Sequence, residues 1–223
     1  MKNTHIANIV FNDFRNDSRV EKTCRSLVLA GYEVTVFALG CPGLPVYEER
    51  EGWKVVRSGG SGRTLSLVCL AWRFLSNAHK FSIVHCNDIE PLPLACLAKI
   101  LKLGRIGIVY DAHELETEKL AARGLRKFLS RLLERVLMPF VDEIITVSDY
   151  IAAWYANKYG VKTPTVVFNA PPLWNLRQSD LFRNRFNLSS GTRIFLYLGG
   201  IQRGRAIEIM LDAFSGVEGA ALV

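Results

Sequence analysis

Short apolar runs alternate with longer segments of helical periodicity along the first 170 residues. The short runs are rich in β-branched and aromatic residues, which predicts strands, whereas the longer segments repeat apolar residues every three or four positions, as amphipathic helices do. This alternation is typical of a parallel sheet whose strands are joined by crossover helices. The predicted strands are residues 5–11, 33–39, 53–57, 82–86, 106–110, 143–147 and 165–168.

Five helices are predicted between these strands. The first has the clearest limits, because Ser18 and Glu21 have the spacing of a capping box and Gly31 stands where a helix-ending glycine is expected. Strands and helices together make a doubly wound domain of about 170 residues, a usual domain size. The predicted helices are residues 18–30, 64–79, 91–103, 119–138 and 148–159.

The alternation breaks where two consecutive prolines, Pro171 and Pro172, interrupt it as a linker would. A second α/β unit follows. We therefore expect an α/β protein: a Rossmann-like, doubly wound parallel sheet followed by an incomplete second Rossmann-like domain. The chain looks cut short, because it stops inside an apparent strand. The expected limits are 1–170, a linker at 171–190, and 191–223, with a strand at 193–198, a helix at 203–214 and an apolar run at 220–223.

Composition and charge exclude several classes of protein. With 49% hydrophobic and 22% charged residues, the chain is neither disordered nor collagen-like. Five cysteines without zinc or CxxC spacing indicate reduced thiols in a cytosolic protein. The net charge is +7, but no helix-turn-helix, zinc-finger or RNP pattern is present, so we expect no nucleic-acid partner. No segment approaches the ~20 consecutive apolar residues of a membrane span.

Polar residues follow three of the predicted strands, in the loops 12–18, 87–90 and 111–114. Loops at the carboxyl ends of parallel strands form the default ligand site of an open α/β sheet, and these three would lie on the same edge. The candidate site residues at this edge are Asp13, Asp17, Asp88, Asp111, His113 and Glu114.

His113 stands between two carboxylates at a strand end, where an imidazole could polarise a hydroxyl or exchange a proton. A purely structural histidine, bonded to a neighbouring carboxylate, is the other interpretation. The acidic residues of these loops could also bind a divalent cation. Since nothing in their spacing fixes an octahedral arrangement, and since such residues more often cap helices or contact hydroxyls, we expect neither a metal nor a cofactor.

Two glycine-rich segments could bind phosphate through backbone amides. Residues 59–63 lack the Lys-Ser/Thr of a Walker loop, which indicates a simple connection. Gly199 and Gly200 instead follow a strand directly and precede a helix, so their amides and the helix dipole would face an anion, with charge added by Arg203 and Arg205. We expect these four residues to bind phosphate.

Residues 119–135 carry six basic side chains against one glutamate, interleaved with leucines and Phe128. A basic amphipathic helix of this kind can lie on an anionic membrane surface. Alternatively, its apolar stripe packs on the sheet while its charges are solvated. Both interpretations remain open at this point.

These residues resemble the glycosyltransferases of the GT-B fold, specifically those of family 4 that build bacterial surface polysaccharides. The similar segments occur in the family's order and at sensible spacing over nearly the whole chain. They are residues 16–22 with 29–36, 84–88 with 92–95, 110–115, 144–148 with 166–171, and 197–208.

The resemblance implies a retaining, hexosyltransferase-type reaction that moves a sugar from a nucleotide-diphosphate donor to a saccharide or lipid-linked acceptor, usually without a metal. The first domain would hold the acceptor and the second the donor. By position, His113 would contact the reacting sugar, and Asp88 and Asp111 would lie near the acceptor.

The resemblance places Gly199, Gly200 and Arg205 at the donor phosphates. A helix N-terminus and a guanidinium can stabilise the departing diphosphate in place of a metal. Two features depart from the family: Gly200 stands where many members have an arginine, and the later acidic motif that binds the donor sugar is absent because the sequence ends at Val223.

We therefore expect a cytoplasmic glycosyltransferase, in contact with the inner face of the cell membrane, that is inactive as this isolated chain. One alternative is a split transferase whose donor domain is completed by a partner chain, which would co-purify. Another is a non-catalytic module that binds sugar or membrane without nucleotide affinity. A GT-B epimerase acting on a nucleotide sugar is a weaker option.

Overall fold

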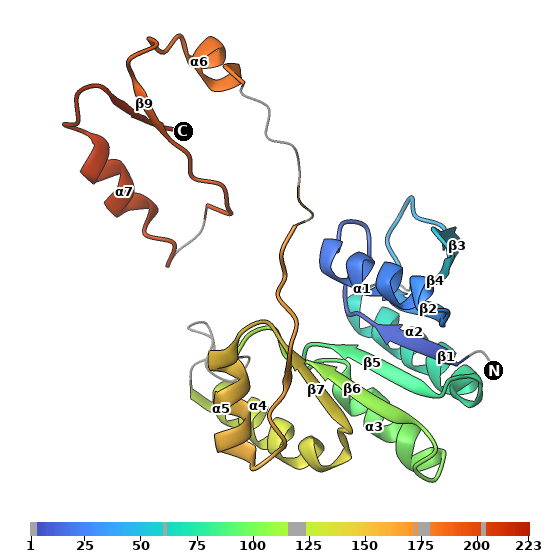
Figure 1. Ribbon diagram of the computed structural model, residues 1–223. Coiled ribbons are helices and arrows are strands. Elements are labelled where there is room, and N and C mark those ends of the chain that lie inside the picture. The colour runs from blue at the N-terminus through green and yellow to red at the C-terminus, as the bar shows by residue number, and fades with distance from the viewer. Residues whose placement is uncertain (1–3, 60–61, 116–123, 172, 174–178, 202–203) are drawn as a thin grey trace. The chain divides into compact units, whose positions relative to one another are not determined.

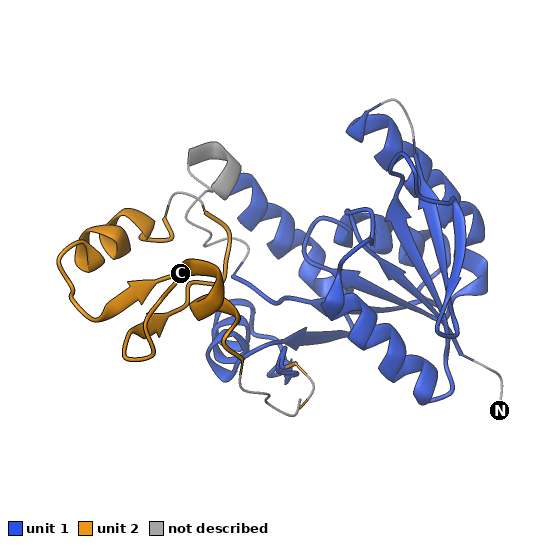
Figure 2. Cartoon of the chain, turned by 90° about the horizontal axis from the view of Figure 1, so that it is seen from above, with its two compact units in different colours: residues 1–170 blue, residues 171–223 orange. Residues whose placement is uncertain are grey.

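The computed structural model describes residues 4–59, 62–115, 124–171, 173, 179–201 and 204–223. The chain forms two compact units, residues 1–170 and 171–223, which Figure 2 shows in blue and orange. Residues 119–123 of one predicted helix and Arg203 of the predicted phosphate site lie outside the described residues.

One eight-stranded sheet forms the first unit, in the order β3-β4-β2-β1-β5-β6-β7-β8 (Figure 1). All neighbouring strands are parallel except β3 and β4, which form an antiparallel hairpin. The predicted α/β class and parallel sheet are thus confirmed. The strands are β1 (His5–Ile9), β2 (Glu33–Leu39), β3 (Tyr47–Arg50), β4 (Trp53–Ser58), β5 (Ile83–Asn87), β6 (Gly107–Asp111), β7 (Glu143–Thr146) and β8 (Thr165–Val166).

The helices of the first unit join these strands close to the predicted positions. Asp17, not Ser18, is the N-cap of the first helix, because its carboxylate accepts a hydrogen bond from the backbone N–H of Val20 at 3.2 Å. Gly31 follows this helix with φ +85°, a conformation that glycine adopts without strain. The helices are α1 (Ser18–Leu29), α2 (Arg63–Asn77), α3 (Leu92–Leu101), α4 (Gly124–Leu137) and α5 (Asp149–Tyr159), with short 3-10 turns η1 (Ala78–Lys80) and η3 (Met138–Phe140).

The side chains of β2 show how the sheet is covered on both faces. Val34 and Val36 pack with α1 on one face, whereas Phe37 and Leu39 pack into a larger core that includes buried residues of α2 and α3 on the other. A strand that is apolar on both sides requires helices on both sides. β1 lies between β2 and β5. In chain order, β2 and β4 are added on one side of β1, and β5 then pairs with β1 on its other side. The boundary of β1 and β5 is therefore the topological switch point, where α/β folds bind ligands.

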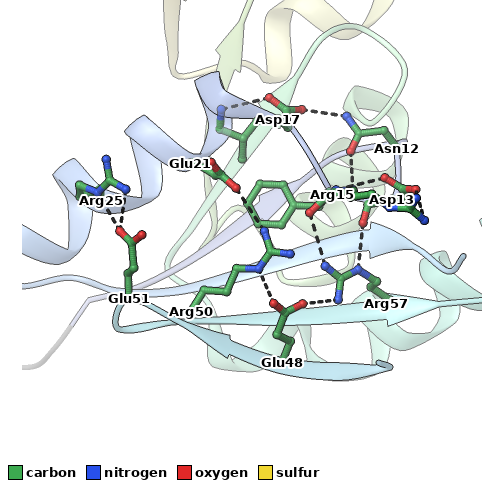
Figure 3. A network of polar contacts seen from close by, with 12 residues as sticks. Asn12, Asp13, Arg15, Asp17, Glu21, Arg25, Glu48, Arg50, Glu51 and Arg57 are labelled. Carbon is green, nitrogen blue, oxygen red and sulfur yellow. Dashed lines mark hydrogen bonds and ion pairs between the residues drawn. The ribbon is translucent and has the colours of Figure 1, made fainter. Parts of the chain in front are cut away.

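A buried arginine ties the β3–β4 hairpin to the loop after β1 (Figure 3). Nε of Arg57 donates to the carbonyl oxygen of Asp13 at 2.9 Å, and its Nη2 donates to that of Phe14 at 3.4 Å. Its Nη1 donates to the carbonyl oxygen of Pro45 at 3.2 Å and to Glu48 at 2.6 Å. These bonds satisfy a charge that would be costly to bury unpaired.

Strand β3, which the sequence did not predict, is held by the same network. Glu48 accepts hydrogen bonds from Arg50 and Arg57, and these, led by the bond from Arg50, lower the pKa of Glu48. The stability that they contribute is present above the ordinary pKa of 4.5 and is lost as the pH falls below it. Arg50 also pairs with Glu21 of α1 at 3.2 Å, which joins the hairpin to the helix.

The second unit holds a two-stranded parallel sheet, in which Ala220 is opposite Arg193. Two predictions for this unit need correction. Its longer helix begins at Ile207 instead of Arg203, and a short helix lies inside the expected linker. The apolar run at 220–223 does form a strand, as predicted. The elements are α6 (Leu181–Phe186), β9 (Arg193–Phe195), α7 (Ile207–Phe214) and β10 (Ala220–Leu222).

A buried carboxylate fixes α4 to the first unit. Glu134 is fully buried, and its Oε1 accepts hydrogen bonds from the hydroxyls of Tyr110 at 2.9 Å and Tyr155 at 2.7 Å. The Tyr159 hydroxyl donates to Oε2 at 2.5 Å. Burial, followed by the neighbouring tyrosine and carboxylate groups, raises the pKa of Tyr110 and Tyr155, which keeps these hydroxyls protonated as donors.

Replacing Glu134 should destabilise the first unit. We expect Glu134→Ala to lower the free energy of unfolding by about 2–4 kcal/mol, because the hydroxyls of two buried tyrosines and one half-buried tyrosine lose their acceptor. Glu134→Gln should cost less, since its amide oxygen still accepts from two tyrosines. Urea denaturation of both variants, with Glu143→Ala at an exposed position as the control, measures the effect. Equal stability of Glu134→Ala and Glu143→Ala would contradict this role.

Candidate functional site

The carboxyl ends of β1 and β5 and the start of α1 border a pocket of about 420 Å³. It lies at the switch point of the sheet, on the edge predicted to carry the site. A larger cavity of about 670 Å³, lined by His5, Lys54 and Lys80 among others, lies toward the opposite ends of the strands. We take the smaller pocket as the candidate site, because charged and amide side chains from several loops converge on it. They are Asn12, Asp17, Arg19, Asn87, Asp88, Glu90, His113 and Asn169.

His113 is held at this pocket through one ring nitrogen. Its Nδ1 lies 2.9 Å from Oδ1 of Asp88 and 2.5 Å from Nη2 of Arg19. A guanidinium can only donate and a carboxylate can only accept, so Nδ1 has a partner in either protonation state. The opposite nitrogen, Nε2, is therefore the atom through which the ring would exchange a proton with a ligand.

Arg19 connects His113 to a buried carboxylate. Its Nη2 lies 2.8 Å from Oδ1 of Asp111, and the two side chains are 15% and 7% exposed. His85, also buried, places Nε2 3.5 Å from Oδ2 of Asp111. Asp111 does not border the candidate pocket; with Arg19 and His85 it lines another pocket, of about 340 Å³, so its contribution to the candidate site is to fix Arg19.

β5 ends at Asn87, and the residue that follows it, Asp88, has an unusual backbone conformation. Asp88 has φ +72°, a strained conformation that Asp and Asn tolerate better than most residues and that is often found at functional sites. The amide of Asn87 donates to Oδ1 of Asn8 and to the carbonyl oxygen of Ile9 at 3.2 Å. Its own Oδ1 is buried and has no hydrogen-bond partner among the described residues. The described residues thus leave the hydrogen-bonding capacity of this oxygen unused.

The structure places only some of the predicted acceptor-side residues at the candidate pocket. Asp17 borders the pocket, where it also accepts a hydrogen bond from Asn12 at 2.8 Å. Asp13 accepts a bond from the backbone N–H of Arg15 at 3.1 Å and lines a different, shallow pocket. Glu114 is exposed and does not border the candidate site.

Sequence reasoning did not identify Arg19, Asn87 or Asn169 as site residues. Asn87 directly precedes Asp88, so the strand-end rule that selected Asp88 applied to it as well. Arg19 and His113 are 94 positions apart, and no local pattern indicates their contact. Asn169 reaches the pocket because Lys22 of α1 donates to its Oδ1 at 2.5 Å.

The predicted phosphate loop lies in the second unit. A Cβ at Gly199 would lie 2.9 Å from the hydroxyl oxygen of Tyr197, so a side chain there would displace the tyrosine ring. That hydroxyl donates to the carbonyl oxygen of Gly200 at 3.0 Å. Arg205 is exposed just before α7. Phosphate binding by these residues stays a prediction.

Two observations concern metals and membranes. Within the described ranges, His, Cys, Asp and Glu side chains form no group of three or more that could hold a metal ion. Among the helices that the structure describes, none has the length and apolar character needed to cross a membrane.

Solved structures share this fold at low sequence identity. Sucrose-phosphate synthase from Thermosynechococcus elongatus gives a TM-score of 0.71 at 18% identity, over 98% of this chain and 61% of that one. Anabaena Alr3699/HepE, solved with UDP and glucose, gives a TM-score of 0.66 at 14% identity, over 98% of this chain and 60% of that one. The lipopolysaccharide outer core galactosyltransferase WaaB gives a TM-score of 0.60 at 14% identity, also over 98% of this chain and 60% of that one. The chain has the Rossmann-like GT-B fold and spans about 60% of the length of these proteins.

The family follows from the sequence of the first unit. Residues 18–170 match the family model of Glycosyltransferase Family 4, which is more than half of the chain. The chain therefore belongs to glycosyltransferase family 4, and the resemblance noted from its motifs is confirmed. A search of curated proteins finds no match.

The buried ion pair between Arg19 and Asp111 should matter for stability. We expect Arg19→Ala to lower the free energy of unfolding by about 2 kcal/mol, because it removes the partner at 2.8 Å from the buried carboxylate of Asp111 and leaves only His85, at 3.5 Å. Arg25→Ala, in the same helix, should change it by less than about 0.5 kcal/mol, because its pair with Glu51 is exposed. Thermal and urea unfolding compare the two variants, and equal losses would contradict the proposed role of Arg19.

Proposed function

We propose that this chain contributes the acceptor-side domain, and part of the donor-binding domain, of a retaining glycosyltransferase. The enzyme would transfer a hexosyl-type sugar from a nucleotide-diphosphate donor to a saccharide or lipid-linked acceptor in bacterial cell-surface polysaccharide synthesis. The observation that carries the proposal is the convergence of His113, Asp88, Arg19 and Asn87 on one pocket at the switch point. Family membership and the UDP and glucose bound to Alr3699/HepE support it.

In this proposal the pocket positions the sugar hydroxyls. The unpartnered Oδ1 of Asn87 accepts a hydrogen bond from one hydroxyl, and Nε2 of His113 contacts the reacting sugar. Asp88 stabilises the ring when Nδ1 is protonated, and Arg19 donates to Nδ1 when it is not. The histidine thus keeps one orientation while its charge changes.

The donor phosphates would be bound by the second unit. Backbone amides at Gly199 and Gly200 and the guanidinium of Arg205, with Arg203 outside the described residues, stabilise the charge on the departing nucleoside diphosphate. The bond between the anomeric carbon and the phosphate oxygen breaks, the acceptor oxygen forms the new bond on the same face of the sugar, and the proton of the acceptor hydroxyl passes to the departing phosphate oxygen. This arrangement requires neither a metal nor another cofactor.

We propose that the 223-residue chain has little transfer activity by itself. Its second unit rests on a two-stranded sheet, and neither α6 nor α7 buries a side chain. A donor site supported by so small a hydrophobic core would be poorly stabilised.

A split transferase is the second candidate. Within the described part of the chain, β9 and β10 pair only with each other, so a partner chain could extend this sheet. A partner that co-purifies and restores nucleotide-sugar turnover would support this version.

We also propose a cytoplasmic location at the inner face of the membrane. The five cysteines are all free, and Cys24, Cys86 and Cys96 are buried. Burial raises the pKa of Cys24 to about 12 and of Cys96 to about 11, which keeps both thiols protonated and unreactive at neutral pH.

The proposal predicts that transfer depends on His113. The protein purified from its source should release nucleoside diphosphate from one of a panel of UDP-, GDP- and ADP-sugars when a saccharide or lipid-linked acceptor is added. His113→Ala should lower kcat by about 100-fold or more, as the loss of a proton-exchanging group does. His79→Ala, at an exposed histidine outside the pocket, should stay within about twofold.

Two results would count against this account. Equal kcat values for His113→Ala and His79→Ala would remove His113 from the reaction. Failure of the source protein, with any co-purifying chain, to use any sugar of the panel would remove the proposed activity itself.

A further inference from the structure

Helix α4 presents its apolar side chains outward. Glu134 is buried on the inner side of the helix, and Leu132 and Val136, two positions before and after it, point away because successive helical residues are about 100° apart. The exposed apolar side chains, 39% to 61% accessible, are Phe128, Leu129, Leu132, Leu133 and Val136. Of the interpretations left open by the sequence, packing of the apolar stripe on the sheet does not hold for these five side chains, whereas Leu137 in the last turn does pack against the core.

Helix α3 extends this surface. It packs beside α4 on the same face of the sheet (Figure 1), and it too leaves large apolar side chains exposed. These are Leu97, Ile100 and Leu101, followed by Leu103 just after the helix. We call the exposed side chains of α3 and α4 the α3–α4 face. Several adjacent exposed leucines on two neighbouring helices are uncommon on a monomeric protein and mark an interaction surface.

The charges of the α3–α4 face have one sign. Arg131 and Arg135 are exposed beside the apolar stripe of α4, and Arg105 is exposed after α3. Neither helix carries an acidic residue other than the buried Glu134. The two carboxylates that follow α4 are each matched by a lysine, Asp142 with Lys99 at 2.6 Å and Glu143 with Lys162 at 3.5 Å. A surface whose exposed charged side chains are all basic is electrostatically complementary to an anionic partner.

We propose that the α3–α4 face docks on an anionic lipid surface. Leucine, isoleucine and phenylalanine side chains would enter the boundary between headgroups and acyl chains, and the flanking arginines would contact lipid phosphates. Long basic side chains suit this position because their stems are apolar while their charged ends reach the headgroups. The Glu134–tyrosine cluster is what turns the apolar stripe outward.

Vesicle binding tests the proposal without any nucleotide sugar, so its outcome is independent of the proposed transfer activity. The purified chain is sedimented with phosphatidylcholine vesicles that contain or lack phosphatidylglycerol. We expect binding at least about tenfold stronger to the anionic vesicles, and weaker binding as salt is raised.

Paired variants identify the surface. Arg131→Gln with Arg135→Gln, and separately Leu132→Ser with Val136→Ser, should each weaken binding about tenfold. Lys54→Gln with Arg185→Gln removes the same charge elsewhere, and Leu29→Ser with Leu181→Ser removes apolar groups elsewhere. These controls should bind as the unchanged chain does. Thermal unfolding checks that all four proteins are folded.

Three results would overturn the proposal. The first is no binding to anionic vesicles, and the second is equal weakening by the α3–α4 variants and their controls. The third is a concentration-dependent dimer, seen by sedimentation equilibrium and abolished by Leu132→Ser with Val136→Ser, in a chain that does not bind vesicles. That last result would assign the α3–α4 face to a second copy of the chain.

Discussion

The parallel pairing of β1 between β2 and β5 is the constraint on which the rest of the first unit depends. It brings the loops after β1 and β5 to one edge, and the pairing of β5 with β6 adds the loop that carries His113. Because β2 is apolar on both sides, helices must cover both faces, which leaves the strand ends as the place where polar loops can meet. The pocket is thus a consequence of topology before any particular side chain is considered.

Buried charged side chains then fix the loops and side chains at this edge of the sheet. Arg57 holds the loop after β1 against the hairpin, and Arg19 lies between Asp111 and His113. In each case a guanidinium donates to several acceptors at once, so that burying it is tolerated only in one arrangement. Glu134 plays the equivalent part on the other face, where three tyrosine hydroxyls fix the rotation of α4. The orientation of His113 and that of the α3–α4 face both depend on such paired charges.

The periodicity of apolar residues predicted seven of the eight strands of the first unit, and all of these except the two-residue β8 contain buried apolar side chains. It missed β3, whose sequence, Tyr-Glu-Glu-Arg, has no apolar run and is held by pairing with β4 and by Arg57. Asp88 and His113, which strand-end position selected, both border the pocket. Strand-end position could not reveal Arg19, which contacts His113 across 94 positions, nor the outward rotation of α4, which depends on the long-range bonds of Glu134.

The central claim is that this edge pocket holds the reacting sugar, and the position of a bound nucleotide sugar tests it most directly. A crystal structure of the source protein, soaked with the nucleotide sugar that it turns over, should show the sugar in contact with His113 and Asp88 at the carboxyl ends of β1 and β5. A sugar bound instead in the cavity lined by His5 and Lys80, or one without contact to His113, would contradict the account.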